Sequence, residues 1–281
     1  NPAAKHIKGM EAENYIRDAR SIIAKTLKVA DKEILFTSGG SESNNMALIG
    51  TAMANKRAGM HIISTNVEHA SIYNTLGFLQ EQGFEITYLP VDHNGHIDLD
   101  QLREAVRPDT ILVSVMYVNN EVGSVEPVAE ISRVIKAKNP STIFHVDAIQ
   151  AYGKYEIRPK KEGIDLLSVS GHKIHGPKGV GALFIKDRVK VKPVIYGGGQ
   201  QGGMRSGTEN VPGIAGMALA AEMTYRDLDA NVAHMRELKE HLIDELTQID
   251  DVYSNSGDAP HIASITFKGV RSEVMLHALE E

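Results

Sequence analysis

Ten residues, Ser170-Gly171-His172-Lys173-Ile174-His175-Gly176-Pro177-Lys178-Gly179, indicate more about the fold than any other stretch of the chain. They follow an apolar run, Ile164–Val169, that is typical of a buried strand bounded by small residues and glycine. A lysine delivered at a strand end suits a Schiff-base nucleophile, because such an amine must be held in position. For an isolated segment, a surface lysine in a Gly/Pro turn is the simpler interpretation, so the role of Lys173 depends on residues upstream.

A second β-branched run, Phe144-His145-Val146-Asp147, ends in a carboxylate before Ala148-Ile149-Gln150. Pyridoxal phosphate needs a lysine for its Schiff base, a carboxylate that keeps its pyridine nitrogen protonated, and a polar cradle for its phosphate. Lys173 and Asp147 fit the first two needs. Taken alone, Asp147 is equally compatible with a helix N-cap.

The segment Phe36-Thr37-Ser38-Gly39-Gly40-Ser41-Glu42-Ser43-Asn44 fits the third need. It predicts a strand, a Gly-Gly turn and a helix whose first turn carries Ser41. Unpaired N–H groups at a helix start bind anions readily, because they lie at the positive end of the helix dipole. Many α/β proteins contain such a turn, but its combination with Asp147 and Lys173, each at a predicted strand end, indicates a pyridoxal-phosphate site.

These segments belong to a longer ordered set, and together they carry a family resemblance. The chain resembles a cysteine desulfurase, a fold-type-I pyridoxal-phosphate enzyme of the aminotransferase class V superfamily. The motifs are Thr37-Ser38-Gly39-Gly40-Ser41-Glu42-Ser43-Asn44-Asn45, Val67-Glu68-His69, Val118-Asn119-Asn120-Glu121-Val122-Gly123, His145-Val146-Asp147-Ala148-Ile149-Gln150, Ser170-Gly171-His172-Lys173 and Gly203-Met204-Arg205-Ser206-Gly207-Thr208.

The resemblance implies roles around the cofactor ring. Lys173 is expected to form the Schiff base and to move protons, and Asp147 to pair with the pyridinium nitrogen. His69 is expected to stack on the ring and to act as an acid or base, although it is also compatible with a helix cap near Ala70. Gln150 is expected to donate to the phenolate oxygen, with Asn120 near that oxygen and the substrate carboxylate.

The resemblance also implies how the phosphate is held. Gly40, Ser41, Ser170 and His172 are expected to bind it. The family usually has Thr at the position of Ser41, and the hydroxyl is retained here. Thr208 is expected to reach the phosphate of a neighbouring subunit, which makes a homodimer part of the active site.

The implied reaction converts L-cysteine to L-alanine, with the sulfur transferred as an enzyme persulfide to an acceptor protein for iron–sulfur cluster assembly or tRNA thiolation. Two alternatives remain at this stage. One is another class V enzyme, such as a selenocysteine lyase or an aminotransferase. The other is a non-catalytic sulfur-trafficking scaffold.

The chain contains no cysteine, which excludes disulfides, thiolate metal sites and the persulfide-forming nucleophile of the resembled family. Against the family pattern, Asn1-Pro2-Ala3-Ala4 matches an internal point, and His277–Glu281 stops before the expected cysteine loop. We therefore expect a chain truncated at both ends.

Composition indicates an ordinary globular protein, with 42% hydrophobic and 23% charged residues. A net charge of −6 argues against nucleic acid as the main partner. No apolar run approaches the ~18 residues of a membrane span, and no secretory signal opens the chain, so a cytoplasmic location is the default expectation. His93-Asn94-Gly95-His96 resembles a metal cluster in composition, but Asn-Gly here predicts a turn, and no metal site is expected.

Strand and helix patterns alternate along most of the chain, which predicts an α/β fold with a mostly parallel seven-stranded sheet covered by helices on both faces. Gly181–Ile185 is expected to be antiparallel, because no helix separates it from the preceding strand. A large cofactor-binding domain is predicted over residues 1–229, and part of a small α/β domain over 230–281. Predicted strands are Glu33–Thr37, His61–Thr65, Glu85–Leu89, Thr110–Tyr117, Thr142–Val146, Leu166–Ser170, Gly181–Ile185 and Ala263–Phe267; predicted helices are Met10–Leu27, Ser43–Asn55, Ser71–Gln82, Asp98–Val106, Val128–Lys138, Val211–Ile249 and Ser272–Glu280.

Overall fold

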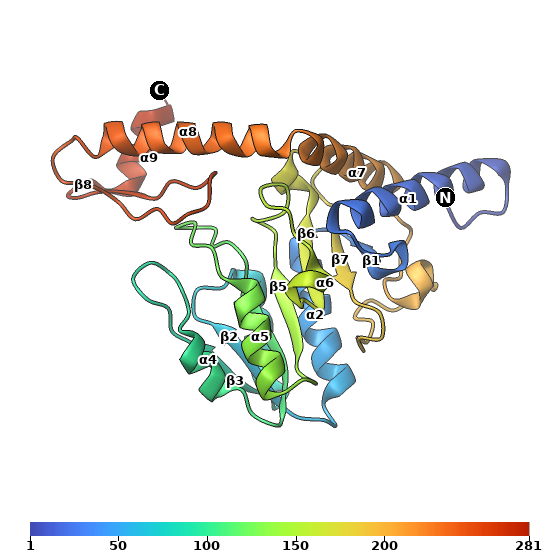
Figure 1. Cartoon of the computed structure of the whole chain (residues 1–281). Coiled ribbons are helices and arrows are strands. Elements are labelled where there is room, and N and C mark those ends of the chain that lie inside the picture. The colour runs from blue at the N-terminus through green and yellow to red at the C-terminus, as the bar shows by residue number, and fades with distance from the viewer. Residues whose placement is uncertain (281) are drawn as a thin grey trace.

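A seven-stranded sheet forms the centre of the protein in a computed structural model that describes residues 1–280 (Figure 1). Its order is β1-β7-β6-β5-β4-β2-β3. β7 runs antiparallel to both of its neighbours, and the other neighbouring strands pair in parallel, which confirms the predicted topology. The strands are β1 (Ile34–Thr37), β2 (His61–Thr65), β3 (Glu85–Leu89), β4 (Thr110–Met116), β5 (Ile143–Asp147), β6 (Leu166–Ser170) and β7 (Gly181–Ile185).

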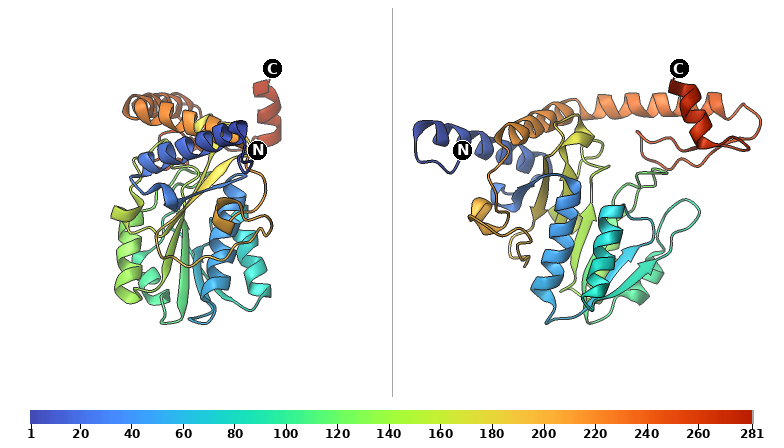
Figure 2. Two further views of the ribbon diagram at one scale, coloured as in Figure 1. Left: turned by 90° about the vertical axis from the view of Figure 1, so that its right-hand side faces the viewer. Right: turned by 180° about the vertical axis from the view of Figure 1, so that it is seen from behind.

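Helices cover both faces of this sheet (Figures 1 and 2). Successive strand residues point to opposite faces, so Leu112 packs beneath α2 and α3, whereas Val113 and Val115 pack with the residues of α1, α5 and α7. Both sides of the inner strands are therefore buried, which explains their nearly continuous apolar sequences. The helices of this part are α1 (Ile7–Leu27), α2 (Gly40–Asn55), α3 (Ala70–Glu81), α4 (Leu99–Ala105), α5 (Val128–Lys138), α6 (Pro159–Glu162) and α7 (Val211–Arg226).

The C-terminal part differs from the prediction of one long helix over Val211–Ile249. The helix breaks at Asp227, whose φ of −113° and ψ of 24° lie outside the helical region, and α8 (Leu228–Leu246) follows. α8 projects away from the sheet (Figure 2) and leads to a separate two-stranded sheet, made of β8 (Val252–Ser254) and β9 (Ile265–Phe267), and to α9 (Ser272–Glu280). The strand β8 was missed, since two of its three residues are exposed and show no apolar run.

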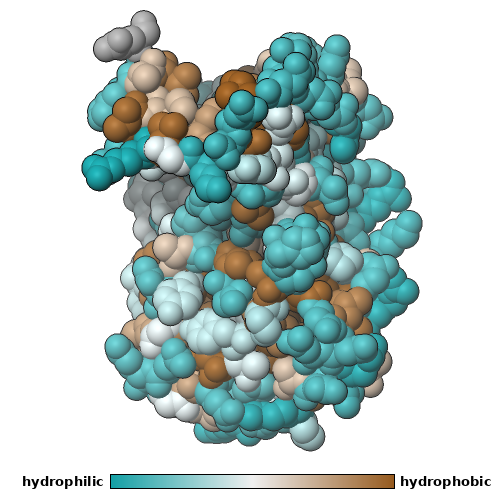
Figure 3. Space-filling view, turned by 90° about the vertical axis from the view of Figure 1, so that its left-hand side faces the viewer, coloured by the Kyte–Doolittle hydropathy of each residue, from teal (hydrophilic) through white to brown (hydrophobic). Residues whose placement is uncertain are grey.

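Apolar side chains are exposed on this projecting segment, notably Val274, Leu276 and Leu279 of α9. The space-filling view shows brown side chains gathered near the C-terminus, above a body on which teal and brown side chains are mixed (Figure 3). Within the described residues, α8 has no buried side chain. Across residues 1–280, no helix combines the length and apolarity that crossing a membrane requires.

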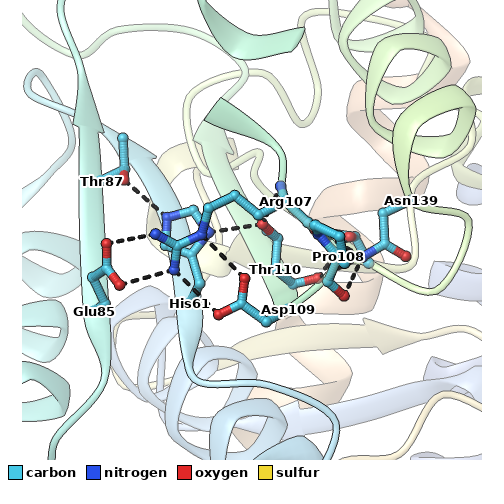
Figure 4. Close-up of polar contacts among 9 residues, drawn as sticks. His61, Glu85, Thr87, Arg107, Pro108, Asp109, Thr110 and Asn139 are labelled. Atoms are coloured by element: carbon cyan, nitrogen blue, oxygen red, sulfur yellow. Dashed lines mark hydrogen bonds and ion pairs between the residues drawn. The ribbon is translucent and has the colours of Figure 1, made fainter. Parts of the chain in front are cut away.

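The starts of β2, β3 and β4 are joined by a polar network around Arg107 (Figure 4). The Arg107 guanidinium donates to both carboxylate oxygens of Glu85, at 2.6 and 2.8 Å. Beside it, the buried His61 ring lies between the hydroxyls of Thr110 and Thr87, with N–O distances of 2.7 and 2.8 Å. This network fixes the starts of the three strands. They lie at the edge of the sheet opposite to the predicted site.

Two glycines allow β7 to approach the turn after β1. A Cβ atom at Gly181 would lie 2.7 Å from the Cα atom of Gly39 and 2.8 Å from the carbonyl oxygen of Val169. Gly39 itself has a φ of 149°, which residues with side chains rarely adopt. The turn that starts α2 is therefore held against the sheet by backbone contact.

We predict that Gly181→Ala lowers the free energy of unfolding by about 1–3 kcal/mol, because the added methyl group meets rigid backbone atoms. The matched control is Gly77→Ala in α3, where an added Cβ has no atom within 4 Å. The control should be neutral or stabilise the protein by up to about 1 kcal/mol, since alanine favours a helix. Urea unfolding of both variants measures the difference, and equal stabilities would contradict the proposed contact.

Candidate active site

A cavity of about 210 Å³ lies at the carboxyl edge of the sheet. This is the edge at which parallel α/β sheets bind ligands. All of the predicted site residues except Ser170 and Thr208 line it. The lining residues are Gly40, Ser41, His69, Ser71, Met116, Val118, Asn120, Asp147, Ile149, Gln150, His172 and Lys173.

Asp147 is the last residue of β5 and is buried at the cavity. Its Oδ2 accepts a hydrogen bond from Nδ2 of Asn44 at 2.8 Å, and its Oδ1 accepts one from the backbone N–H of Ile149 at 3.0 Å. Burial raises the pKa of this carboxyl, although both hydrogen bonds and the charge of His69 act in the opposite direction. Both donors are neutral, so a protonated ring nitrogen in the cavity would provide a matching positive charge. The site therefore fits a pyridinium cofactor.

His69 combines the two roles that the sequence left open. It is the N-cap of α3, where its Nδ1 accepts from the backbone N–H of Ser71 at 3.1 Å, and it also lines the cavity. The Ser71 hydroxyl lies 2.9 Å from the same nitrogen and accepts from Asn44 at 2.9 Å. Because Nδ1 accepts, Nε2 carries the proton in the neutral ring. One amide, Asn44, thus contacts Asp147 and orients His69 through Ser71.

Lys173 lies in a short 3₁₀ turn, Gly171–Ile174, that follows β6 directly. Its backbone carbonyl accepts a hydrogen bond from Nζ of Lys154, a residue that the sequence analysis did not select. Burial lowers the pKa of Lys154 to about 8, and the positive charge of Lys173 acts in the same direction. Lys178 lies further along the loop and does not line the cavity. Lys173 is therefore the lysine placed to react with a bound aldehyde.

The far side of the cavity has the features of an anion site. α2 begins at Gly40, and its N-cap residue, Gly39, has no side chain to occupy the first N–H groups. The imidazole of His172 lines the same region, with Nδ1 2.8 Å from the hydroxyl of the buried Ser170. Ser170 thus lies behind His172, outside the cavity lining, and its predicted phosphate contact stays a prediction.

Thr208 is exposed in the segment before α7 and does not line this cavity. Nearby, the Arg205 guanidinium pairs with Glu42 in the first turn of α2, at 2.8 Å. This ion pair fixes the segment relative to the start of α2. The predicted role of Thr208 in a neighbouring subunit remains a prediction.

The predicted turn at His93–His96 is confirmed. The Asp92 carboxylate accepts from the backbone N–H groups of Asn94 and His96, both at 2.9 Å, and Gly95 has a φ of 88°. Within residues 1–280, no group of three or more His, Asp or Glu side chains is arranged to hold a metal ion.

Glu68 is a buried acid next to the site that the sequence analysis did not single out from its motif. Its Oε1 accepts from the Thr65 hydroxyl at 2.8 Å and from the backbone N–H of Met116 at 3.0 Å. Its Oε2 has no hydrogen-bond partner among the described residues. Burial raises the pKa of Glu68 to about 8, and the charges of Asp147 and Glu126 add to this effect. Burial therefore favours the neutral, protonated form of Glu68.

We predict that Glu68→Gln removes a pH-dependent loss of stability. In the unfolded chain Glu68 ionises near 4.5, whereas in the folded protein its pKa is about 8. The folded state therefore holds an extra proton between these values, and wild-type stability falls as the pH rises through this range.

The free energy of unfolding of Glu68→Gln should exceed that of the wild type by an amount that grows from about pH 4.5 to 8. Denaturant unfolding across this range measures it, with Glu104→Gln, an exposed acid on α4, as the control. A constant difference at all pH values would contradict the raised pKa.

The fold and the cavity define an α/β enzyme of the pyridoxal-phosphate-dependent kind. The chain matches the family Aminotransferase class-V over residues 2–281. It is 45% identical to a cysteine desulfurase, IscS, of Dictyoglomus turgidum, with 99% of this chain and 71% of that protein covered. A solved "NIFS-LIKE PROTEIN" superimposes with a TM-score of 0.97 at 39% identity, over 100% of this chain and 77% of that one.

A second solved structure, "SspA in complex with cysteine", gives a TM-score of 0.85 at 39% identity, over 100% of this chain and 79% of that one. The chain belongs to the class-V aminotransferase family and, within it, to the cysteine desulfurases. This confirms the resemblance and the fold class inferred from the sequence.

Proposed function

We propose that the protein is a pyridoxal-phosphate-dependent cysteine desulfurase that takes L-cysteine as its substrate. The observation that carries this proposal is the placement of Lys173 and Asp147 at one cavity, on the neighbouring strand ends of β6 and β5. The relatives named cysteine desulfurase and the related structure solved with cysteine support the substrate.

When bound, pyridoxal phosphate provides an electron sink for bonds at the substrate Cα and Cβ atoms. Asp147, held by Asn44 and Ile149, would keep the ring nitrogen protonated. Lys173 would hold the cofactor, and its Nζ, which lies in the same cavity, would take and return a proton at the substrate. His69, whose Nδ1 accepts from Ser71, would offer the N–H of Nε2 to the cavity.

The phosphate would be bound by the first N–H groups of α2, Ser41 and His172, with Ser170 orienting the imidazole. Gln150 and Asn120 also line the cavity and could donate to the cofactor or the substrate. Together with Asp147 and His69, these residues would hold the cofactor in the cavity.

Sulfur transfer requires a thiolate from outside these residues, because the sequence has no cysteine. The thiolate attacks the substrate sulfur and forms a persulfide bond, while the carbon–sulfur bond breaks and its electron pair stays with the carbon skeleton. Protonation of that carbon gives L-alanine. The named relatives do not favour a selenocysteine lyase, an aminotransferase or a non-catalytic scaffold.

The proposal also covers the oligomeric state of the protein and the protein that accepts the sulfur. We propose a homodimer in which Thr208 reaches the partner's phosphate site, and its exposure before α7 is compatible with that role. The acceptor would be an iron–sulfur scaffold or a tRNA-thiolation protein, in keeping with the IscS names of the relatives. A cytoplasmic location remains a prediction.

The first test identifies the reactive lysine. Borohydride reduction of the protein loaded with pyridoxal phosphate should attach the pyridoxyl group to Lys173, because this lysine lines the cavity. Peptide mapping by mass spectrometry distinguishes it from Lys154, which is close but directed at a backbone carbonyl, and from the more distant Lys178. A tag on either of the other two would refute the assignment.

The second test addresses Asp147. Asp147→Ala leaves the ring nitrogen without its counter-charge, so alanine release from cysteine should fall about 100-fold or more and cofactor binding should weaken. Asp18→Ala, an exposed change on α1, is the control. Both are made in a protein that includes the acceptor thiol, and alanine is quantified by chromatography. Near-normal turnover of Asp147→Ala would remove this residue from the mechanism.

A further inference from the structure

His261 brings the C-terminal part of the chain to the cavity wall. It lies in the connection between β8 and β9, which returns from the projecting α8 toward the strand ends (Figure 1). Its Nε2 is 3.3 Å from Oε1 of Gln150, a residue of the cavity lining. His261 lies outside the motifs that predict the site, because its contact depends on how this connection folds back.

Several contacts fix the connection that carries His261. The backbone N–H of Gly257 donates to the carbonyl of Val122 at 2.7 Å, and that of Ala259 donates to the carbonyl of Gly123 at 2.9 Å. From α8, Nζ of Lys239 donates to the carbonyls of Gly257 and Ala259. Ala259 is fully buried. His261 is therefore held beside Gln150 by its own backbone.

The surroundings of His261 keep its ring neutral. Burial lowers its pKa to about 4, and the positive charges of Lys154, Lys239 and Lys173 act in the same direction. In a neutral ring, Nε2 can donate to the Gln150 oxygen only if it carries the ring proton. Nδ1 then has no proton, and it is buried with no partner among the described residues.

This contact determines which end of the Gln150 amide faces the cavity. A side-chain amide has an oxygen that accepts and an NH₂ group that donates. Since the oxygen is engaged by His261, the NH₂ group is left for the cavity. The opposite orientation would present an acceptor there and would repel a negatively charged ring oxygen.

We infer that His261 is a positioning residue that fixes the Gln150 amide so that its NH₂ group donates to the ring oxygen of the bound cofactor. This inference rests on the proposed function. His261 acts through Gln150, so its effect is on the electronic state of the cofactor.

The test follows the visible absorption of bound pyridoxal phosphate as a function of pH. A donor to the ring oxygen favours its deprotonated form, so losing that donor raises the pH midpoint of the spectral change. We expect His261→Leu to raise the midpoint by about one pH unit, a tenfold change in the equilibrium. His261→Gln, which keeps an N–H donor, should keep the midpoint close to the wild-type value, and His241→Leu on the exposed part of α8 should leave it unchanged.

A second measurement needs neither the cofactor nor a variant. Nitrogen NMR of the unloaded wild-type protein should show His261 with its proton on Nε2 and none on Nδ1 at pH 7. A proton on Nδ1, or a midpoint that stays constant or falls in a folded His261→Leu protein, would overturn the inference. If the wild type itself binds no pyridoxal phosphate at Lys173, the proposed function fails instead, which separates the two results.

Discussion

The site is organised around the buried carboxylate of Asp147. A charge at this depth is unfavourable unless hydrogen bonds or an opposite charge compensate for it, and here two neutral donors provide part of that compensation. Asn44 of α2 donates to Asp147 and also to the Ser71 hydroxyl, which in turn contacts Nδ1 of His69. Burial favours the neutral form of the nearby Glu68. The negative charge of Asp147 is thus only partly compensated, and a bound cation would complete the compensation. Binding of a cationic cofactor should therefore also stabilise this region.

The order and direction of the strands bring the reactive groups to one edge of the sheet. β5 and β6 are parallel neighbours, so Asp147 and Lys173 come to the same edge, and the turn after β1 reaches them because β7 runs antiparallel beside it. The glycine contact between this turn and β7 then brings the start of α2 close to the cavity. At the opposite edge, Arg107 and His61 join the strand starts through hydrogen bonds.

Sequence reasoning predicted the seven strands and most of the cavity, because buried parallel strands have continuous apolar runs and their polar termini are conspicuous. It did not predict Lys154, Glu68 or His261, since their importance comes from burial and from contacts between distant segments. Asn44 was within a recognised motif, but its role required the position of Asp147. The break at Asp227 was missed because the helical pattern continues on both sides of it.

The connection between β8 and β9 contacts the cavity wall and a turn next to it. Through His261 it contacts Gln150, and through Gly257 and Ala259 it is bonded to the turn that follows Asn120. The projecting α8 is attached to the same connection by Lys239. The segment therefore connects α8 to the cavity wall through direct contacts. By thermodynamic reciprocity, any effect of the docking of this segment on cofactor affinity must be matched by an equal effect of the cofactor on the docking.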